Sequence, residues 1–117
     1  MKRIYIAGPY TSGDVAANVA RAIEAWHALA DRGFAPFCPH LSHFLHLQRQ
    51  RPYEDWMAQD LEWLSACDAL LRLPGESTGA DQEVAYAKAH GIHVWYSIES
   101  IGWSSIDDRL GPGEAQP

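Results

Sequence analysis

The fold is decided by residues 68–96, which read DALLRLPGESTGADQEVAYAKAHGIHVWY. The apolar run over 68–73 is typical of a buried strand, and Pro74-Gly75 ends it. Helical spacing follows over 78–91, and a second short apolar run covers 93–96. A strand, a helix and another strand in succession predict two parallel strands joined by a right-handed crossover.

The same alternation runs through the preceding part of the chain. Apolar runs predict strands over 2–7 and 34–37, and apolar side chains at three- and four-residue spacing predict helices over 15–29 and 53–66. Gly33 stands where a left-handed helix cap is expected. We therefore predict an α/β protein, a flavodoxin-like or Rossmann-like three-layer sandwich with a parallel sheet of four or five strands.

Three segments complete the predicted organisation. Residues 40–51 have helical spacing but a polar end, which indicates a partly helical excursion. Residues 100–103 are a candidate fifth strand. We expect one domain over residues 1–110, and a tail over 111–117 that is too rich in Gly, Pro and Glu to order itself.

Composition narrows the function classes. Nine Lys and Arg against fifteen Asp and Glu give a net charge of −6, which disfavours a nucleic-acid partner. No apolar run reaches the ~18–20 residues of a membrane span, and no cleavable leader is recognisable. Cys38 and Cys67 lie among apolar neighbours, where reduced thiols are usual. We expect a cytoplasmic protein without a membrane partner.

Ligands of such folds bind at the carboxyl ends of the strands, so the loops at 8–14 and 74–78 are the first candidates. The loop 8–14 leads from a strand into a helix, where backbone N–H groups and the hydroxyls of Thr11 and Ser12 could hold a phosphate. The alternative is a simple turn with Ser12 or Asp14 as the helix cap.

Glu83 is the first candidate for chemistry, because it lies in the first turns of the helix that begins near Thr78. The helix dipole favours an ionised carboxylate there, and an ionised carboxylate is a nucleophile. The alternative is a solvated acid that complements the dipole. Asp81 is better placed for that role, three residues after Thr78 in a capping box.

Asp60 and Tyr5 are polar groups in apolar settings. Burial would raise the pKa of Asp60 and make it a proton donor, unless it lies at the edge of the helix and reaches water. Tyr5, on the first strand, would need a hydrogen-bond partner, and a carboxylate could provide one. Asp60 lies in a helical stripe that is expected to face the core: Trp56, Met57, Asp60, Leu61, Trp63, Leu64 and Cys67.

His40, His43 and His46 recur at every third residue after Cys38. They could ligate a metal, but steps of three drift by about 60° each along a helix, and no Asp, Glu or second Cys completes a ligand set nearby. We expect instead that imidazoles line a pocket together with Phe44. The five tryptophans stand mostly at helix-face positions that are typical of a core.

Three motifs together resemble the nucleoside 2-deoxyribosyltransferase family and its relatives, the nucleoside 5′-monophosphate N-glycosidases. They are KRIYIAG at 2–8, DLEWLSACD at 60–68 and STGADQEVAYA at 77–87. The resemblance implies that Glu83 is the nucleophile, that Asp60 acts near the sugar, and that Tyr5 bonds the nucleophile. Ser77 departs from the transferases, where an Asp usually handles the base, and is similar to the hydrolases, where a serine faces the 5′-phosphate.

The resemblance implies an N-glycosidase that cleaves the base from a (deoxy)nucleoside 5′-monophosphate through a glycosyl-glutamate intermediate. Base exchange by a deoxyribosyltransferase and a non-catalytic nucleotide-binding module are the alternatives. No metal or organic cofactor is implied, and the expected assembly is a homodimer or larger homo-oligomer. The candidate substrate-binding residues are Gly8, Pro9, Tyr10, Thr11, Ser12, Gly13, His40, Ser77 and Gly79.

Overall fold

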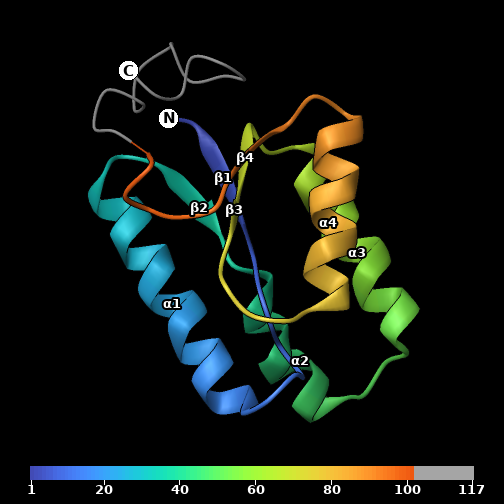
Figure 1. Ribbon diagram of the computed structural model, residues 1–117. Coiled ribbons are helices and arrows are strands. Elements are labelled where there is room, and N and C mark those ends of the chain that lie inside the picture. The colour runs from blue at the N-terminus through green and yellow to red at the C-terminus, as the bar shows by residue number, and fades with distance from the viewer. Residues whose placement is uncertain (102–117) are drawn as a thin grey trace.

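The computed structural model describes residues 1–101, and a parallel sheet forms its centre (Figure 1). The four strands pair in the order β2-β1-β3-β4, and every pair is parallel. The strands are β1 Arg3–Ala7, β2 Ala35–Phe37, β3 Ala69–Arg72 and β4 His93–Trp95. The helices are α1 Val15–Asp31, α2 Ser42–Gln48, α3 Tyr53–Ser65 and α4 Thr78–Ala89, and a 3₁₀ turn, η1, spans Pro39–Leu41.

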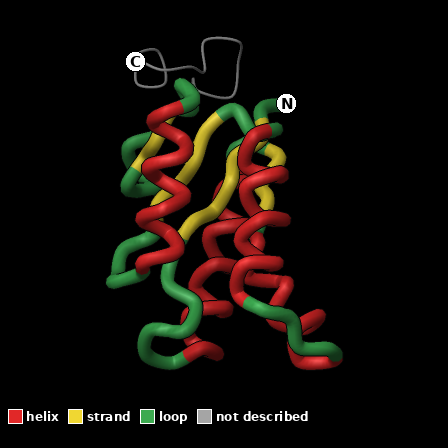
Figure 2. Tube along the Cα trace, turned by 90° about the vertical axis from the view of Figure 1, so that its right-hand side faces the viewer, coloured by secondary structure: helices red, strands yellow, loops and turns green. Residues whose placement is uncertain are grey.

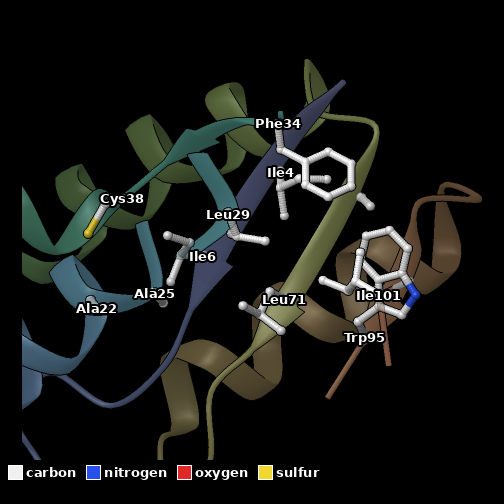
Figure 3. Close-up of a cluster of buried hydrophobic side chains, with 11 residues drawn as sticks. Ile4, Ile6, Ala22, Ala25, Leu29, Phe34, Cys38, Leu71, Trp95 and Ile101 are labelled. Atoms are coloured by element: carbon white, nitrogen blue, oxygen red, sulfur yellow. The ribbon is translucent and has the colours of Figure 1, made fainter. Parts of the chain in front are cut away.

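Helices cover both faces of the sheet, with α1 on one side and α3 and α4 on the other (Figures 1 and 2). Successive side chains of a strand point to opposite faces, so β1 contributes to two cores. Ile4 and Ile6 pack with Leu29 of α1 and Leu71 of β3 (Figure 3). On the other face, Tyr5, Ala7 and Leu70 of the sheet pack with Leu64 of α3 and with Ala80 and Ala87 of α4. The predicted flavodoxin-like α/β sandwich is confirmed.

Local signals place the helix ends. Asp14 caps α1, because its carboxylate accepts the backbone N–H groups of Ala16 and Ala17. Gly33 follows the helix with φ +88°, as the left-handed cap requires. Residues 40–51 form the expected partly helical excursion, as η1 and α2.

The structure describes only part of the predicted C-terminal segments. Residues 100 and 101 do not belong to a strand, and the rest of the candidate fifth strand lies outside the described residues. The proposed tail at 111–117 also lies outside them. Within residues 1–101, no helix is both long enough and apolar enough to cross a membrane.

The prediction that one stripe of α3 faces the core is wrong in its extent. In this helix only Leu64 is buried, while Leu61 and the following Cys67 pack at the margin of the core. Trp63 is 54% exposed and stacks on Phe37 with ring centroids 5.2 Å apart. A helix that borders a cavity shows the same apolar spacing as one that borders a core, because both surfaces avoid water. Of the tryptophans in the described part, only Trp95 is fully buried.

Candidate active site

A cavity of about 620 Å³ opens at the carboxyl ends of β1 and β3. Its walls come from the loop after β1, from η1 and α2, from the first half of α3 and from the beginning of α4. Its size falls within the ~300–1,000 Å³ typical of small-molecule sites. The lining residues are Gly8, Tyr10, Thr11, Ser12, Pro39, His40, Ser42, His46, Arg51, Tyr53, Trp56, Met57, Asp60, Glu76, Ser77, Thr78, Gly79, Ala80, Gln82 and Glu83.

Tyr5 and Glu83 form a buried hydrogen bond at the floor of this cavity. The alternation along β1 turns the Tyr5 side chain toward α4, and its hydroxyl donates to Glu83 Oε2 at 2.5 Å. Glu83 is 5% exposed and Tyr5 is fully buried. Burial raises the pKa of Tyr5 well above its usual value, and the nearby Glu83 charge raises it further. Tyr5 is therefore a permanent donor that fixes one carboxylate oxygen.

Asp60 supplies a second carboxyl group to the same cavity. It is half-buried in α3, and burial raises its pKa from 3.8 to about 7. Burial likewise raises the pKa of Glu83 from 4.5 to about 8; the Tyr5 hydrogen bond and the charge of Arg72 lower it, whereas the charge of Asp60 raises it. Two such groups titrate as a pair. Tyr5, Asp60 and Glu83, which the sequence singled out separately, are thus brought together.

Burial at Glu83 outweighs the expected effect of the helix dipole, which favours the ionised carboxylate. Glu83 lies in the second turn of α4, and at 5% exposure its charge is removed from water. The dipole stabilises a charge by ~0.3–1 kcal/mol and acts mainly within the first turn, whereas desolvation of a buried carboxylate costs several kcal/mol. Desolvation therefore dominates, and at neutral pH the carboxyl group holds its proton most of the time.

The beginning of α4 also differs from the predicted capping box. Ser77 is the N-cap, and its Oγ accepts the backbone N–H of Ala80 at 3.0 Å. Asp81 instead pairs with Arg72 at 2.9 Å. Because the Ser77 hydroxyl accepts in this bond, its own proton remains free to donate into the cavity.

The candidate substrate-binding loop divides into two parts. Gly8, Tyr10, Thr11 and Ser12 line the cavity, as do His40, Ser77 and Gly79. Pro9 and Gly13 are not among the lining residues. Pro9 is buried, and its carbonyl oxygen accepts a hydrogen bond from His40. The Pro9 ring also leaves no room for a side chain at Gly75, because a Cβ there would lie 2.7 Å from the ring. Gly13 adopts φ +82° in an exposed turn.

The three histidines do not share one site. His40 and His46 line the cavity, whereas His43 forms a hydrogen bond with Tyr10. Phe44 is 57% exposed and is not a lining residue. The expected role in lining a pocket is therefore found for two imidazoles and not for Phe44. Burial lowers the pKa of His40. In residues 1–101, no three His, Cys, Asp or Glu side chains are grouped so that they could hold a metal ion.

Sequence reasoning did not single out Arg51 and Tyr53 as site residues, and it assigned Trp56 and Met57 to the core. The Tyr53 hydroxyl donates to Gln82 at 3.1 Å and also lies against Gly79. These two contacts join α3 to the beginning of α4. The helical stripe that contains Asp60 is the signal that identifies Trp56 and Met57. Arg51 lies in a connector without periodicity, and no comparable signal identifies it.

Comparison with known proteins agrees with this architecture. The chain is similar to the solved structure of a 2-deoxyribosyltransferase from the psychrotolerant bacterium Bacillus psychrosaccharolyticus, with a TM-score of 0.61, 17% identity and 98% of each chain covered. At this identity the likeness establishes the fold. No curated protein matches the sequence. One family model, described as a domain of unknown function (DUF7768), matches residues 2–97, and the chain therefore belongs to that family.

Proposed function

We propose that the protein breaks the bond between the base and the sugar of a nucleoside 5′-monophosphate, with Glu83 as the nucleophile. The observation that carries this proposal is the buried Tyr5–Glu83 hydrogen bond of 2.5 Å, which faces a cavity that also holds Asp60. A nucleophilic carboxylate beside an acid with a raised pKa is the arrangement that retaining displacement at an anomeric carbon requires.

Each group has one role in the reaction. In the first step an oxygen of ionised Glu83 bonds to C1′, the bond from C1′ to the base nitrogen breaks, and the leaving base takes the proton of Asp60. In the second step water attacks C1′ of the glycosyl ester, gives a proton to Asp60 and releases the Glu83 carboxylate. Tyr5 orients Glu83 throughout and stabilises its charge.

The hydroxyl-rich end of the cavity supports a nucleotide as the substrate. Thr11 and Ser12 come from the loop before α1, and Ser77 comes from the beginning of α4. The hydroxyl protons of these three residues suit a phosphate dianion. The backbone N–H groups of Ala16, Ala17 and Ala80 at the two helix N-termini are already bonded to Asp14 and Ser77. Arg51, the one Lys or Arg side chain among the lining residues, adds a positive charge.

A panel of nucleosides and their 5′-monophosphates tests the proposal through the release of free base. We expect release from at least one monophosphate, faster than from its nucleoside, and none with Glu83→Gln. Adding a second free base distinguishes hydrolysis from the alternative of base exchange, which would yield a new nucleoside or nucleotide. Tight nucleotide binding without any product would instead identify a binding module.

We also propose a homodimer or larger homo-oligomer. The apolar side chains of Phe44, Leu45 and Leu47 on α2 are 57–67% exposed, which is unusual for a surface that remains in water. Light scattering after size-exclusion chromatography measures the assembly. A monomeric mass at micromolar concentration would contradict this expectation.

A further inference from the structure

The excursion between β2 and α3 is tied to the cavity walls by imidazole hydrogen bonds. Helix α2 buries no residue, and no side chain caps its beginning. A helix of seven residues is not stable without packing or other contacts. The hydrogen bonds of its histidines join it to the cavity walls.

The first two of these contacts reach the loop after β1. His40 Nε2 donates to the carbonyl oxygen of Pro9 at 3.0 Å, which anchors η1. His43 Nδ1 lies 2.7 Å from the hydroxyl of Tyr10, and the two rings meet edge to face with centroids 5.6 Å apart. Tyr10 lines the cavity, so the second contact sets the orientation of a cavity wall.

The third contact reaches α3 and the connector that precedes it. His46 Nδ1 accepts the indole N–H of Trp56 at 2.9 Å and the backbone N–H of Arg51 at 3.3 Å. Both partners are donors, so His46 Nδ1 acts as the acceptor in both bonds. Trp56 also lines the cavity.

The spacing of the histidines explains why they reach different walls. Steps of three residues turn each imidazole by about 60° from the last. On α2 this offset lets His43 reach Tyr10 while His46 reaches Trp56. Helix α2 thereby couples two aromatic walls that belong to separate elements.

We propose that His43 and His46 are positioning residues, which hold Tyr10 and Trp56 in the orientation that receives the substrate. The substrate's identity rests on the proposed function. The hydrogen bonds themselves belong to the free protein, so they can be measured without any turnover.

Substitution of His46 tests the third contact. Asparagine places an acceptor oxygen near the position of Nδ1, whereas leucine removes the acceptor. In the free protein, His46→Leu should speed hydrogen exchange of the Arg51 amide and the Trp56 indole by about tenfold, and His46→Asn by less than about twofold. His27→Leu is the matched control, because His27 is exposed on α1 and does not line the cavity.

Turnover provides the second measurement. His46→Leu should raise KM about fivefold while kcat changes less than about twofold, and His46→Asn should restore KM. For His43, the variants His43→Leu, Tyr10→Phe and the double variant should raise KM by the same factor, because each removes the same bond.

Three results would overturn the inference. The first is unchanged hydrogen exchange of the Arg51 amide and the Trp56 indole in His46→Leu. The second is a His46→Asn variant with the same exchange rates and KM as His46→Leu. The third is additive effects of His43→Leu and Tyr10→Phe on KM. If no nucleoside or nucleotide reacts with the unmodified protein, the proposed function fails. Accelerated exchange in His46→Leu with retention in His46→Asn would still support the positioning role, and unchanged exchange would still refute it.

Discussion

Replacing Glu83 with Gln should make the protein more stable, and the gain should grow with pH. In the folded protein burial raises the pKa of Glu83 from 4.5 to about 8, so the folded state binds a proton that the unfolded chain has released. Stability therefore falls as pH rises from about 4.5 to about 8. Glutamine keeps the size of the side chain and an oxygen that can accept from Tyr5, but it has no charge to bury.

The size of the effect follows from the pKa. At ~1.4 kcal/mol for each tenfold change in proton affinity, a rise from 4.5 to about 8 corresponds to at most about 5 kcal/mol. Water entering the open cavity on ionisation reduces this figure, and we expect a gain of ~2–4 kcal/mol above pH 8. For a domain of this size, that gain raises Tm by roughly 10–25 °C.

Urea unfolding at pH 5, 7 and 9, followed by circular dichroism, measures the effect. Glu62→Gln is the matched control, because Glu62 is exposed on α3 and its substitution should leave the pH dependence unchanged. Curves for Glu83→Gln that run parallel to those of the unmodified protein would refute the reasoning, as would a variant less stable at pH 9.

Three further predictions concern turnover. Catalysis needs ionised Glu83 and protonated Asp60, whose pKa values are about 8 and about 7, so kcat/KM should peak between pH 7 and 8. Asp60→Asn should lower kcat and abolish the alkaline limb of this profile, without loss of stability. Tyr5→Phe removes a bond that lowers the pKa of Glu83, which already lies above that of Asp60, so the alkaline limb should move to higher pH and the maximal kcat/KM should fall; an unmoved alkaline limb would contradict this. Ser77→Gly weakens the cap of α4 by only a few tenths of a kcal/mol. It should raise KM for the monophosphate roughly tenfold and leave KM for the nucleoside little changed. Equal effects on both KM values would favour the transferase reaction.

The parts of the site that the sequence predicted depend on strict local geometry. Alternation along β1 determines that Tyr5 and Ile4 face opposite sides of the sheet, and the turn before α4 places Glu83 early in that helix. Both follow from residue spacing alone. The pairing of Tyr5 with Glu83 came from the family resemblance, because the two residues are 78 positions apart and only the folded sheet brings them together.

The parts that were missed depend on what surrounds an element. Spacing on α3 could not tell a core from a cavity wall, so Trp56 was assigned to the wrong surface. The cap of α4 is Ser77 and not Thr78, and Asp81 pairs with Arg72 at the end of β3, a partner that is distant in sequence and therefore not visible in a local capping pattern. Arg51 was missed because its position depends on a bond to His46 across a short connector.

The raised pKa values also bear on how an acidic chain could hold a phosphate. The formal charge of −6 counts Asp60 and Glu83 as ionised, whereas at neutral pH burial keeps Glu83 mainly protonated and Asp60 about half protonated. The charge at the cavity floor is thus smaller than the sequence implies. The other charged lining residues, Glu76 and Arg51, carry opposite charges. A phosphate near the hydroxyls of Thr11, Ser12 and Ser77 would therefore meet less repulsion from the cavity floor than the formal charge implies, and distant surface charges are screened beyond about 8–10 Å at physiological salt.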